Sequence, residues 1–291
     1  MNEVALFVSN PVTRSLLHIP IMEQVRKNVN ADLKIVFECD SNGFIVFIFH
    51  TLDWSPFFDC QVLSSEEGVW KSKETRFFTG PRDLRFDMPV CFNGAIHLIS
   101  TCSPYEDMSM PYIVSYNYEN GMSRMLSVPK EARRGFHHVS CDMAIFKWGK
   151  VTNSTESICL VRLLKSAFTV WVLTDYESNS WRRIMKAKVI AMVGSREQNP
   201  VVTGYIVLND ECLVFTTENK VYSYNWTQME IMEIGEHKCE SSKISIISYS
   251  NTLRPCGILS SPSYNVNAIS LDEESTPSNS EVLPSSLQVV P

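Results

Sequence analysis

The residues best suited to metal or acid–base chemistry lie in one short segment. His137, His138, Cys141 and Asp142 supply imidazole, thiol and carboxylate groups, which are the ligand types that bind zinc. Their spacing matches no zinc pattern, and no second Cys or His pair follows nearby. We therefore interpret this segment as structural, and the sequence predicts no metal site and no cofactor.

Patterns typical of catalysis are weak in the rest of the chain. The sequence contains no nucleophile elbow, no glycine-rich phosphate loop and no zinc-binding helix motif. Adjacent carboxylates such as Glu66 with Glu67 lie in predicted turns, where solvation explains them. Glycoside chemistry needs two carboxylates that face each other across a cleft, and a sequence cannot establish that arrangement. We expect no catalytic residues and a protein that is not an enzyme.

The elements that would position any site are short strands. Runs rich in Val, Ile, Phe and Tyr return at roughly 40–60 residues, which is the period of four-stranded propeller blades, and we count five such units. Asn42-Gly43, Asn93-Gly94 and Asn209-Asp210 separate pairs of these runs and predict hairpins. Helix signals are limited to short turns near residues 22–29, 123–125 and 131–135. The predicted fold is an all-β β-propeller of four-stranded antiparallel blades.

Composition limits both the class of protein and its partners. With 291 residues, 44% of them hydrophobic, the chain can bury a large core without disulfides, and its nine scattered cysteines indicate free thiols in a reducing compartment. With a formal charge of −6, the chain has no overall positive potential that would attract the phosphates of nucleic acid. Neither a leader peptide nor a membrane span is recognisable. We expect a location in the cytoplasm or the nucleus, with neither nucleic acid nor membrane as partner.

The composition changes near the C-terminus. From Ser260 onward, Ser, Pro, Asn and Glu dominate, and such a segment cannot bury enough apolar surface to offset the entropy of ordering. The sequence therefore predicts a propeller domain over residues 1–258 and a disordered Ser/Pro-rich tail over residues 259–291.

Candidate partner-binding residues lie in the longest irregular stretches, residues 52–65 and 100–111. Exposed aromatic and Met side chains suit a protein partner, and the candidates are Trp54, Tyr105, Met108 and Met110. Burial in the core is an equally weighted alternative for Trp54 and Tyr105. Two basic clusters, at residues 130–134 and 182–188, are interpreted as solvated charge in turns or at strand ends.

Four segments together carry a resemblance to a known family. They are Asn10 to Arg14 followed by Leu17 and Pro20, Pro89 to Leu98, Phe168 to Leu173, and Tyr176 to Trp181. On the basis of these four segments, the chain without its C-terminal tail resembles the kelch-type, F-box-associated β-propeller domain of plant F-box proteins. The residues that match the family motifs in structural positions are Asn10, Pro11, Thr13, Arg14, Pro20, Asn93, Gly94, Trp171 and Trp181. One departure is His97-Leu98-Ile99, where the family often has a Trp after the Asn-Gly turn.

The resemblance implies substrate recognition for an SCF-type cullin–RING ubiquitin ligase. In that family the propeller holds an unidentified target protein, while a separate helical F-box holds the adaptor. The chain begins almost at the motif of Asn10, so we expect adaptor binding only if an F-box is supplied elsewhere, and it is open whether the first blade is complete. The alternatives are a propeller enzyme, a carbohydrate-binding protein or a degenerate F-box protein fragment. An enzyme or sugar site predicts converging carboxylates with perturbed pKa values, whereas a recognition module predicts a broad mixed surface without them.

Overall fold

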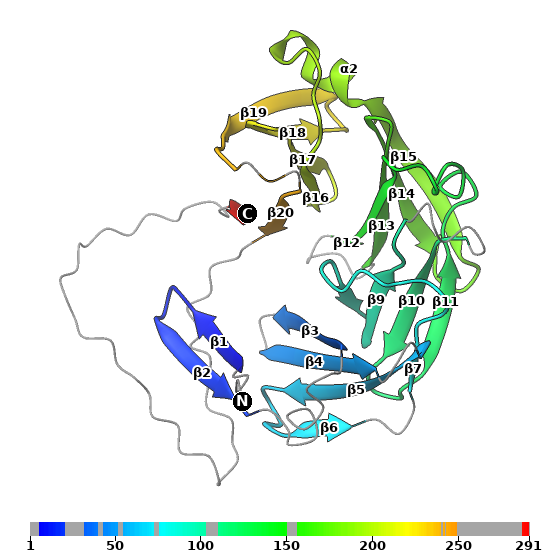
Figure 1. The fold of residues 1–291 in the computed structure, drawn as a ribbon, viewed down its shortest axis with the longest axis vertical. Helices are drawn as coiled ribbons and strands as arrows, with labels where there is room; N and C mark the ends of the chain where they lie inside the picture. The colour runs from blue at the N-terminus through cyan, green and yellow to red at the C-terminus, as the bar shows by residue number, and fades with distance from the viewer. Residues whose placement is uncertain are drawn as a thin grey trace, which may run out of the picture. The chain divides into compact units, whose positions relative to one another are not determined.

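The chain folds into strands connected by short turns. The structure, a computed structural model, describes residues 6–20, 32–39, 43–51, 55–72, 76–102, 110–149, 156–239, 241, 243–248 and 287–290. Contacts divide the chain into two compact units, residues 1–76 with 248–287, and residues 77–247 with 288–291. Apart from one short helix and a 3₁₀ turn, the elements described in both units are strands that pair antiparallel (Figure 1), so the all-β prediction is confirmed.

The first unit consists of a hairpin and a meandering sheet. β1 (Leu6–Asn10) pairs with β2 (Ser15–Ile19). The strands of the sheet follow one another in chain order and are β3 (Asp32–Cys39), β4 (Phe44–Thr51), β5 (Phe57–Ser64) and β6 (Trp70–Ser72). The middle of β4 is buried on both of its faces, which explains why Val46 to Phe49 is an uninterrupted apolar run.

Turn chemistry forms the hairpin of the first unit. The Oδ1 atom of Asn10 accepts hydrogen bonds from the backbone N–H groups of Val12 (2.9 Å) and Thr13 (3.4 Å), and Pro11 fixes the backbone between them. Arg14 has a positive φ of 51°, which returns the chain into β2. At the end of β2, the indole of Trp70 donates to the carbonyl of Pro20. The turn of this motif is therefore formed by residues that are adjacent in the chain.

The second unit contains, within its described residues, three four-stranded meanders, which we name blades A, B and C. Blade A comprises β8 (Val90–Phe92), β9 (Ala95–Ile99), β10 (Tyr112–Asn117) and β11 (Ser123–Ser127). Blade B comprises β12 (Asp142–Trp148), β13 (Ser157–Leu164), β14 (Ala167–Asp175) and β15 (Ser180–Lys188). Blade C comprises β16 (Gly204–Leu208), β17 (Cys212–Thr216), β18 (Lys220–Asn225) and β19 (Glu230–Glu236).

A few short elements flank these blades. β7 (Phe77–Phe78) precedes blade A, while a helix α2 (Val189–Val193) and a 3₁₀ turn (Gly194–Arg196) connect blades B and C. β20 (Ser245–Ser248) pairs with β21 (Leu287–Val290), which is the part of the predicted tail that the structure describes. No helix among the described residues is both long and apolar enough to cross a membrane. The division at residue 258 stays a prediction.

The hairpin signals and the helix signals have different outcomes. Asn93 and Gly94 (φ 50° and 65°) and Asn209 and Asp210 (φ 52° and 61°) form tight turns between paired strands. The helical turn expected at residues 123–125 is wrong, because these residues pair with β10 as strand β11. Residues 131–135 do form turns, and residues 22–29 lie outside the described part of the chain. Partner strands therefore overrode a weak local preference for helix.

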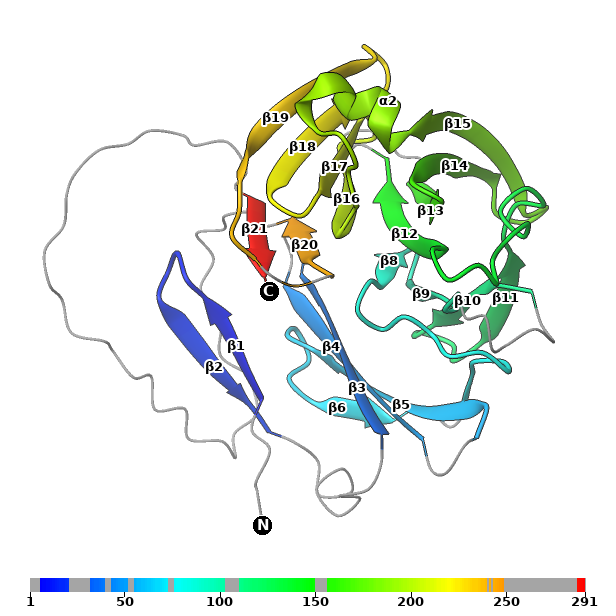
Figure 2. The ribbon, with the colours of Figure 1, turned by 45° about the horizontal axis from the view of Figure 1, so that its top comes forward.

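Consecutive blades pack face to face through apolar side chains. One core cluster joins Phe92 and Ile113 of blade A to Leu160 and Trp171 of blade B. Between blades B and C, the ring of Phe168 lies 5.4 Å from Tyr205 and 5.6 Å from Phe215. Figure 2 shows the three sheets following one another in chain order. Four-stranded antiparallel blades that stack in this way confirm the predicted propeller architecture.

Candidate interaction surface

The structure describes one of the four predicted partner-binding residues. Trp54, Tyr105 and Met108 lie outside the residues that the structure describes. Met110 lies just before β10, and 55% of its surface is exposed. Met110 is therefore accessible to a partner, and its role in binding stays a prediction.

The predicted motif residues of the second unit occupy turns and blade contacts. Asn93 and Gly94 form the turn between β8 and β9. Trp171 is buried in β14, and the guanidinium of Arg162 lies 5.3 Å from its ring centroid. The indole Nε1 of Trp181 donates to the carbonyl of Ser127 at 3.0 Å, which joins β15 of blade B to blade A.

The possible metal ligands do not converge on one point. The Nδ1 atom of His138 accepts hydrogen bonds from the hydroxyl (2.8 Å) and the backbone N–H (3.1 Å) of Ser140. Asp142 instead accepts from Arg85 (3.0 Å) and from the hydroxyl of Tyr205 (2.8 Å). Among the residues with described positions, no group of three potential ligands is close enough to hold a metal ion.

The interactions of Asp142 belong to a buried ionic cluster around Arg85. The guanidinium of Arg85, 8% exposed, also donates to Asp87 (2.8 Å) and to the carbonyl of Met143 (2.9 Å). Burial opposes ionisation of Asp87, but the hydrogen bond and the charge of Arg85 outweigh it and lower the pKa of this carboxyl. A carboxylate held ionised in this way cannot serve as a general acid near neutral pH. The cluster ties the segment before β8 to β12 and β16.

A second buried polar group lies between blades A and B. His97 of β9 donates from Nδ1 to the carbonyl of Val90 (3.1 Å), because a carbonyl can only accept. Its Nε2 atom lies 3.0 Å from the hydroxyl of Tyr176, which also bonds to Ser115. Burial lowers the pKa of His97 to about 4, so the ring is neutral at physiological pH. We interpret this group as a structural contact between the blades.

The carboxyl groups with resolved shifts are all shifted in the same direction. Hydrogen bonding to Arg183 lowers the pKa of Glu131, and hydrogen bonding to Ser178 lowers that of Asp175. Asp87 is lowered as well. Among the described residues, therefore, no carboxyl has a resolved raised pKa of the kind that a catalytic acid requires.

Basic side chains from two distant parts of the sequence form one surface of the second unit. We name it the basic surface and define it as Lys130, Arg133, Arg134, Arg183, Lys186 and Lys188. Arg133 is half-buried and the other five are exposed. This surface contrasts with the whole chain, whose formal charge is −6.

Strand register places the basic residues of β15 on one face of blade B. In β14, Trp171 lies opposite Arg183, Thr169 opposite Lys186, and Ala167 opposite Lys188. Residues opposite each other in an antiparallel pair project on the same side of the sheet. Arg183, Lys186 and Lys188 therefore share the face that carries Trp171, which is the face packed toward blade A.

Arg162 connects this face to the turn at residues 130–134. Its Nη1 atom hydrogen bonds to the carbonyl oxygens of Glu131 (2.7 Å), Ala132 (3.2 Å) and Arg134 (3.0 Å). The carboxylate of Glu131 then accepts two bonds from Arg183, at 2.7 and 2.9 Å. These bonds hold the turn that carries Lys130, Arg133 and Arg134 against the face of blade B that carries Arg183. Residues 130–134 lie in turns, as the sequence predicts, whereas residues 182–188 lie within strand β15 and not in a turn.

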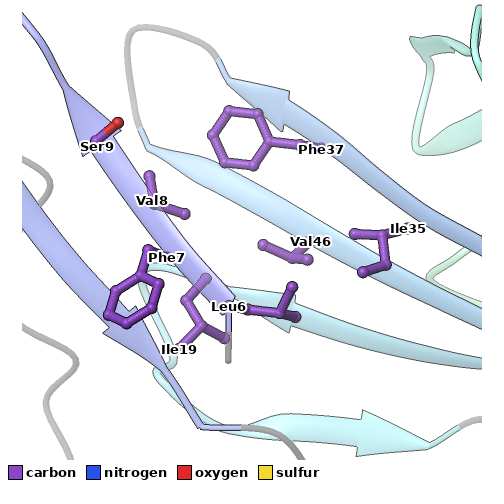
Figure 3. Close-up of a pocket in the computed structure, with 8 residues that line it drawn as sticks. All are labelled: Leu6, Phe7, Val8, Ser9, Ile19, Ile35, Phe37 and Val46. Carbon is purple, nitrogen blue, oxygen red and sulfur yellow. The ribbon is translucent and has the colours of Figure 1, made fainter. Parts of the chain in front are cut away.

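The first unit has an apolar groove of about 200 Å³ between its hairpin and its sheet (Figure 3). Leu6, Val8 and Ile19 of the hairpin face Val46 of β4 across the groove. The remaining lining residues are Phe7, Ser9, Ile35 and Phe37. None of these lining side chains is ionisable, so the groove offers apolar contact and no acid–base chemistry.

The chain matches one family at the level of sequence. The model of the family described as "F-box protein At3g26010-like, beta-propeller" matches residues 1–247. Among curated proteins, none shows significant sequence similarity to the chain.

The solved structures that match the chain are distant from it in sequence. The Dos1 propeller is 10% identical with a TM-score of 0.39, over 80% of this chain and 53% of that one. An exo-β-1,3-galactanase from Phanerochaete chrysosporium is 15% identical with a TM-score of 0.37, over 65% and 46%. A putative 6-phosphogluconolactonase from Bacteroides uniformis is 10% identical with a TM-score of 0.41, over 80% and 64%. The chain thus spans about half the length of the first two structures.

Proposed function

Because the chain belongs to the β-propeller family of F-box protein At3g26010-like proteins, we propose that it is the target-recognition domain of an SCF-type cullin–RING ubiquitin ligase. A propeller domain of an F-box protein family is a protein-interaction module. In the proposed role, the domain holds a target protein while other subunits transfer ubiquitin. Its contribution is to position the target, and it forms no covalent bond itself. This role is carried out in the cytoplasm or the nucleus.

The observation that carries the proposal is the basic surface. Six cationic side chains gather there, and Glu131 is neutralised by Arg183. Such a concentration of one charge on an otherwise acidic protein fits an acidic segment of a target, because complementary charge steers association and selects partners. The matching ligand is a segment rich in Asp and Glu.

An enzymatic or sugar-binding role is the alternative. It requires carboxylates that converge and carry perturbed pKa values. The carboxyl groups whose shifts are resolved in the described residues have lowered values, each explained by an arginine or by local hydrogen bonds. We therefore propose a recognition domain that is not an enzyme.

The attachment to the ligase is a separate part of the proposal. An F-box docks its adaptor through several helices, whereas the described residues contain one five-residue helix and a 3₁₀ turn. We accordingly propose that an adaptor joins only through an F-box that is supplied in addition to the part of the chain described.

The test combines affinity capture with charge reversal. The full chain is compared with the variant Lys186→Glu with Lys188→Glu, and with a fusion that carries a family F-box ahead of Met1. Lys238→Glu with Lys243→Glu is the matched control, because these lysines are also exposed and the charge change is identical. Captured proteins are quantified by mass spectrometry, and ubiquitylation of the leading candidate is assayed with a reconstituted ligase.

We expect one set of proteins to be lost from the Lys186→Glu with Lys188→Glu variant and retained by the control. The fusion should in addition capture adaptor and cullin, and should support ubiquitylation of the same candidate. Loss of that set from both variants alike, or capture of nothing specific by any form, would contradict the recognition role. Capture without ubiquitylation by the fusion would contradict the ligase part alone.

A further inference from the structure

Two thiols from adjoining blades lie in contact in the second unit. The Sγ atoms of Cys102 and Cys141 are 3.7 Å apart. Cys102 follows β9 of blade A after two residues, and Cys141 directly precedes β12 of blade B. A covalent bond between these sulfurs would therefore cross from one blade to the next.

The surroundings make the two sulfurs unequal. The contact with the Cys102 sulfur and the nearby charge of Arg162 together outweigh burial and lower the pKa of the Cys141 thiol. The same contact, together with burial, raises the pKa of Cys102. The thiolate is the reactive form of cysteine, so Cys141 is the nucleophile of the pair and Cys102 holds the proton.

Both residues keep some access to solvent. Cys102 is half-buried, and Cys141 is 8% exposed. Cys159, in contrast, is fully buried in β13, and burial raises the pKa of its thiol. A small oxidant would therefore react with the pair in preference to Cys159.

We propose that Cys102 and Cys141 are a redox-active pair that hydrogen peroxide converts into a disulfide joining blades A and B. The Cys141 thiolate attacks one peroxide oxygen and becomes a sulfenic acid, and the leaving hydroxide takes up a proton to form water. The Cys102 sulfur then attacks the sulfenic sulfur, its proton leaves with the hydroxyl group as a second water, and the S–S bond forms. Two thiols are oxidised by two electrons, and one peroxide is reduced to two waters.

The required movement is small. A disulfide has an S–S length of about 2.05 Å, so the sulfurs must approach by less than 2 Å from their distance of 3.7 Å. The disulfide would close the stretch of chain from Cys102 to Cys141 into a loop and so constrain the unfolded chain. This constraint is expected to raise the melting temperature of the second unit by roughly 5–15 °C. A thiol reductant should reverse both the bond and the shift.

The test maps the bond in the intact chain. Purified protein is treated with hydrogen peroxide, free thiols are blocked with iodoacetamide, and tryptic peptides are identified by mass spectrometry. Cys102 lies on tryptic residues 86–124 and Cys141 on residues 135–147. Because Cys91 shares the first peptide, a Cys91→Ser background assigns the bond to Cys102 without ambiguity.

We expect the cross-linked pair of peptides two hydrogens lighter than the sum of the reduced peptides, and its loss after dithiothreitol. In Cys102→Ser, Cys141 should stop at the sulfenic acid, which dimedone traps, whereas Cys159→Ser should still form the bond. Peroxide treatment that leaves Cys102 and Cys141 alkylated as often as Cys159, or that links either of them to another cysteine, would overturn the proposal. The mapping in the Cys91→Ser background decides the matter even if the Cys102→Ser variant fails to fold.

Discussion

The two contacts between blades of the second unit are built from different chemistry. Between blades B and C, Phe168 packs against Tyr205 and Phe215, and the hydroxyl of Tyr205 adds one hydrogen bond to Asp142. Between blades A and B, an apolar core is accompanied by many polar contacts, such as those of His97 with Tyr176 and of Trp181 with Ser127. Apolar packing contributes stability in proportion to buried area, whereas hydrogen bonds contribute less and fix orientation. The basic surface and the thiol pair both lie at the contact between blades A and B, where hydrogen bonds fix the orientation of one blade relative to the other.

The largest effect should come from the aromatic contact. Phe168→Ala removes a fully buried ring and leaves a cavity against Tyr205 and Phe215, which should lower the free energy of unfolding by about 3–5 kcal/mol. Phe168→Leu keeps most of the volume and should cost about 1–2 kcal/mol. Urea denaturation followed by tryptophan fluorescence measures both. A loss of less than roughly 1 kcal/mol in Phe168→Ala would contradict the view that these ring contacts hold blades B and C together.

The next largest effect is on stability at low pH, and it comes from His97 at the contact between blades A and B. In the unfolded chain His97 takes up a proton near pH 6.5, but in the folded protein only near pH 4. The stability that the neutral ring contributes is therefore complete above pH 6.5 and is lost as the pH falls toward 4, by about 3 kcal/mol in total.

The variant His97→Gln separates the pH dependence caused by His97 from the pH dependence caused by the carboxylates. The difference in unfolding free energy between the wild type and His97→Gln should shrink as the pH falls from 6.5 to 4. Denaturation curves at several pH values measure it. A difference that is constant over this range would mean that His97 titrates normally and is not enclosed between the blades.

A smaller effect tests a single hydrogen bond between blades A and B. Trp181→Phe keeps an aromatic ring in place but removes the Nε1 donor that bonds to the carbonyl of Ser127. The expected loss is about 1 kcal/mol of unfolding free energy. Phe168→Leu gives the reference for a conservative change at the aromatic contact. A loss above 3 kcal/mol would indicate that Trp181 contributes mainly by packing.

The smallest effect on stability should accompany a change in binding. Glu131→Gln removes the exposed ion pair with Arg183, and exposed ion pairs contribute little to folding. The melting temperature should therefore stay the same, while affinity for an acidic peptide should rise roughly two- to fivefold because a competing carboxylate is gone. Differential scanning fluorimetry and fluorescence anisotropy measure the two quantities. Weaker binding would mean that Glu131 itself contacts the partner.

Local features of the fold could be predicted from sequence. The Asn93-Gly94 hairpin and the Asn10 turn depend on residues adjacent in the chain, and the structure has turns at both places. The five-residue helix α2 was not foreseen, because it has no capping side chain and is too short for a periodic signal. The sequence predicts a helical turn at residues 123–125, but these residues pair with β10, the strand directly before them, and form β11.

The basic surface could not be predicted for a related reason. Its two halves are separated by roughly 50 residues, and the hydrogen bonds of Arg162 to the turn carbonyls and the ion pair of Glu131 with Arg183 bring them together. A buried arginine that binds backbone carbonyls has no motif in the sequence. The recurrence of basic residues at 183, 186 and 188 was visible, but the bulge in β15 that aligns them on one face was not.

The most direct test of the account is binding of a glutamate-rich peptide to the purified full chain, followed by fluorescence anisotropy at two salt concentrations. We expect the wild type to bind, with weaker binding at higher salt, and Lys186→Glu with Lys188→Glu to lose at least roughly tenfold in affinity. Lys238→Glu with Lys243→Glu should bind within about twofold of the wild type. No binding by the wild type, or equal losses in the two variants, would contradict the claim that the basic surface recognises an acidic partner.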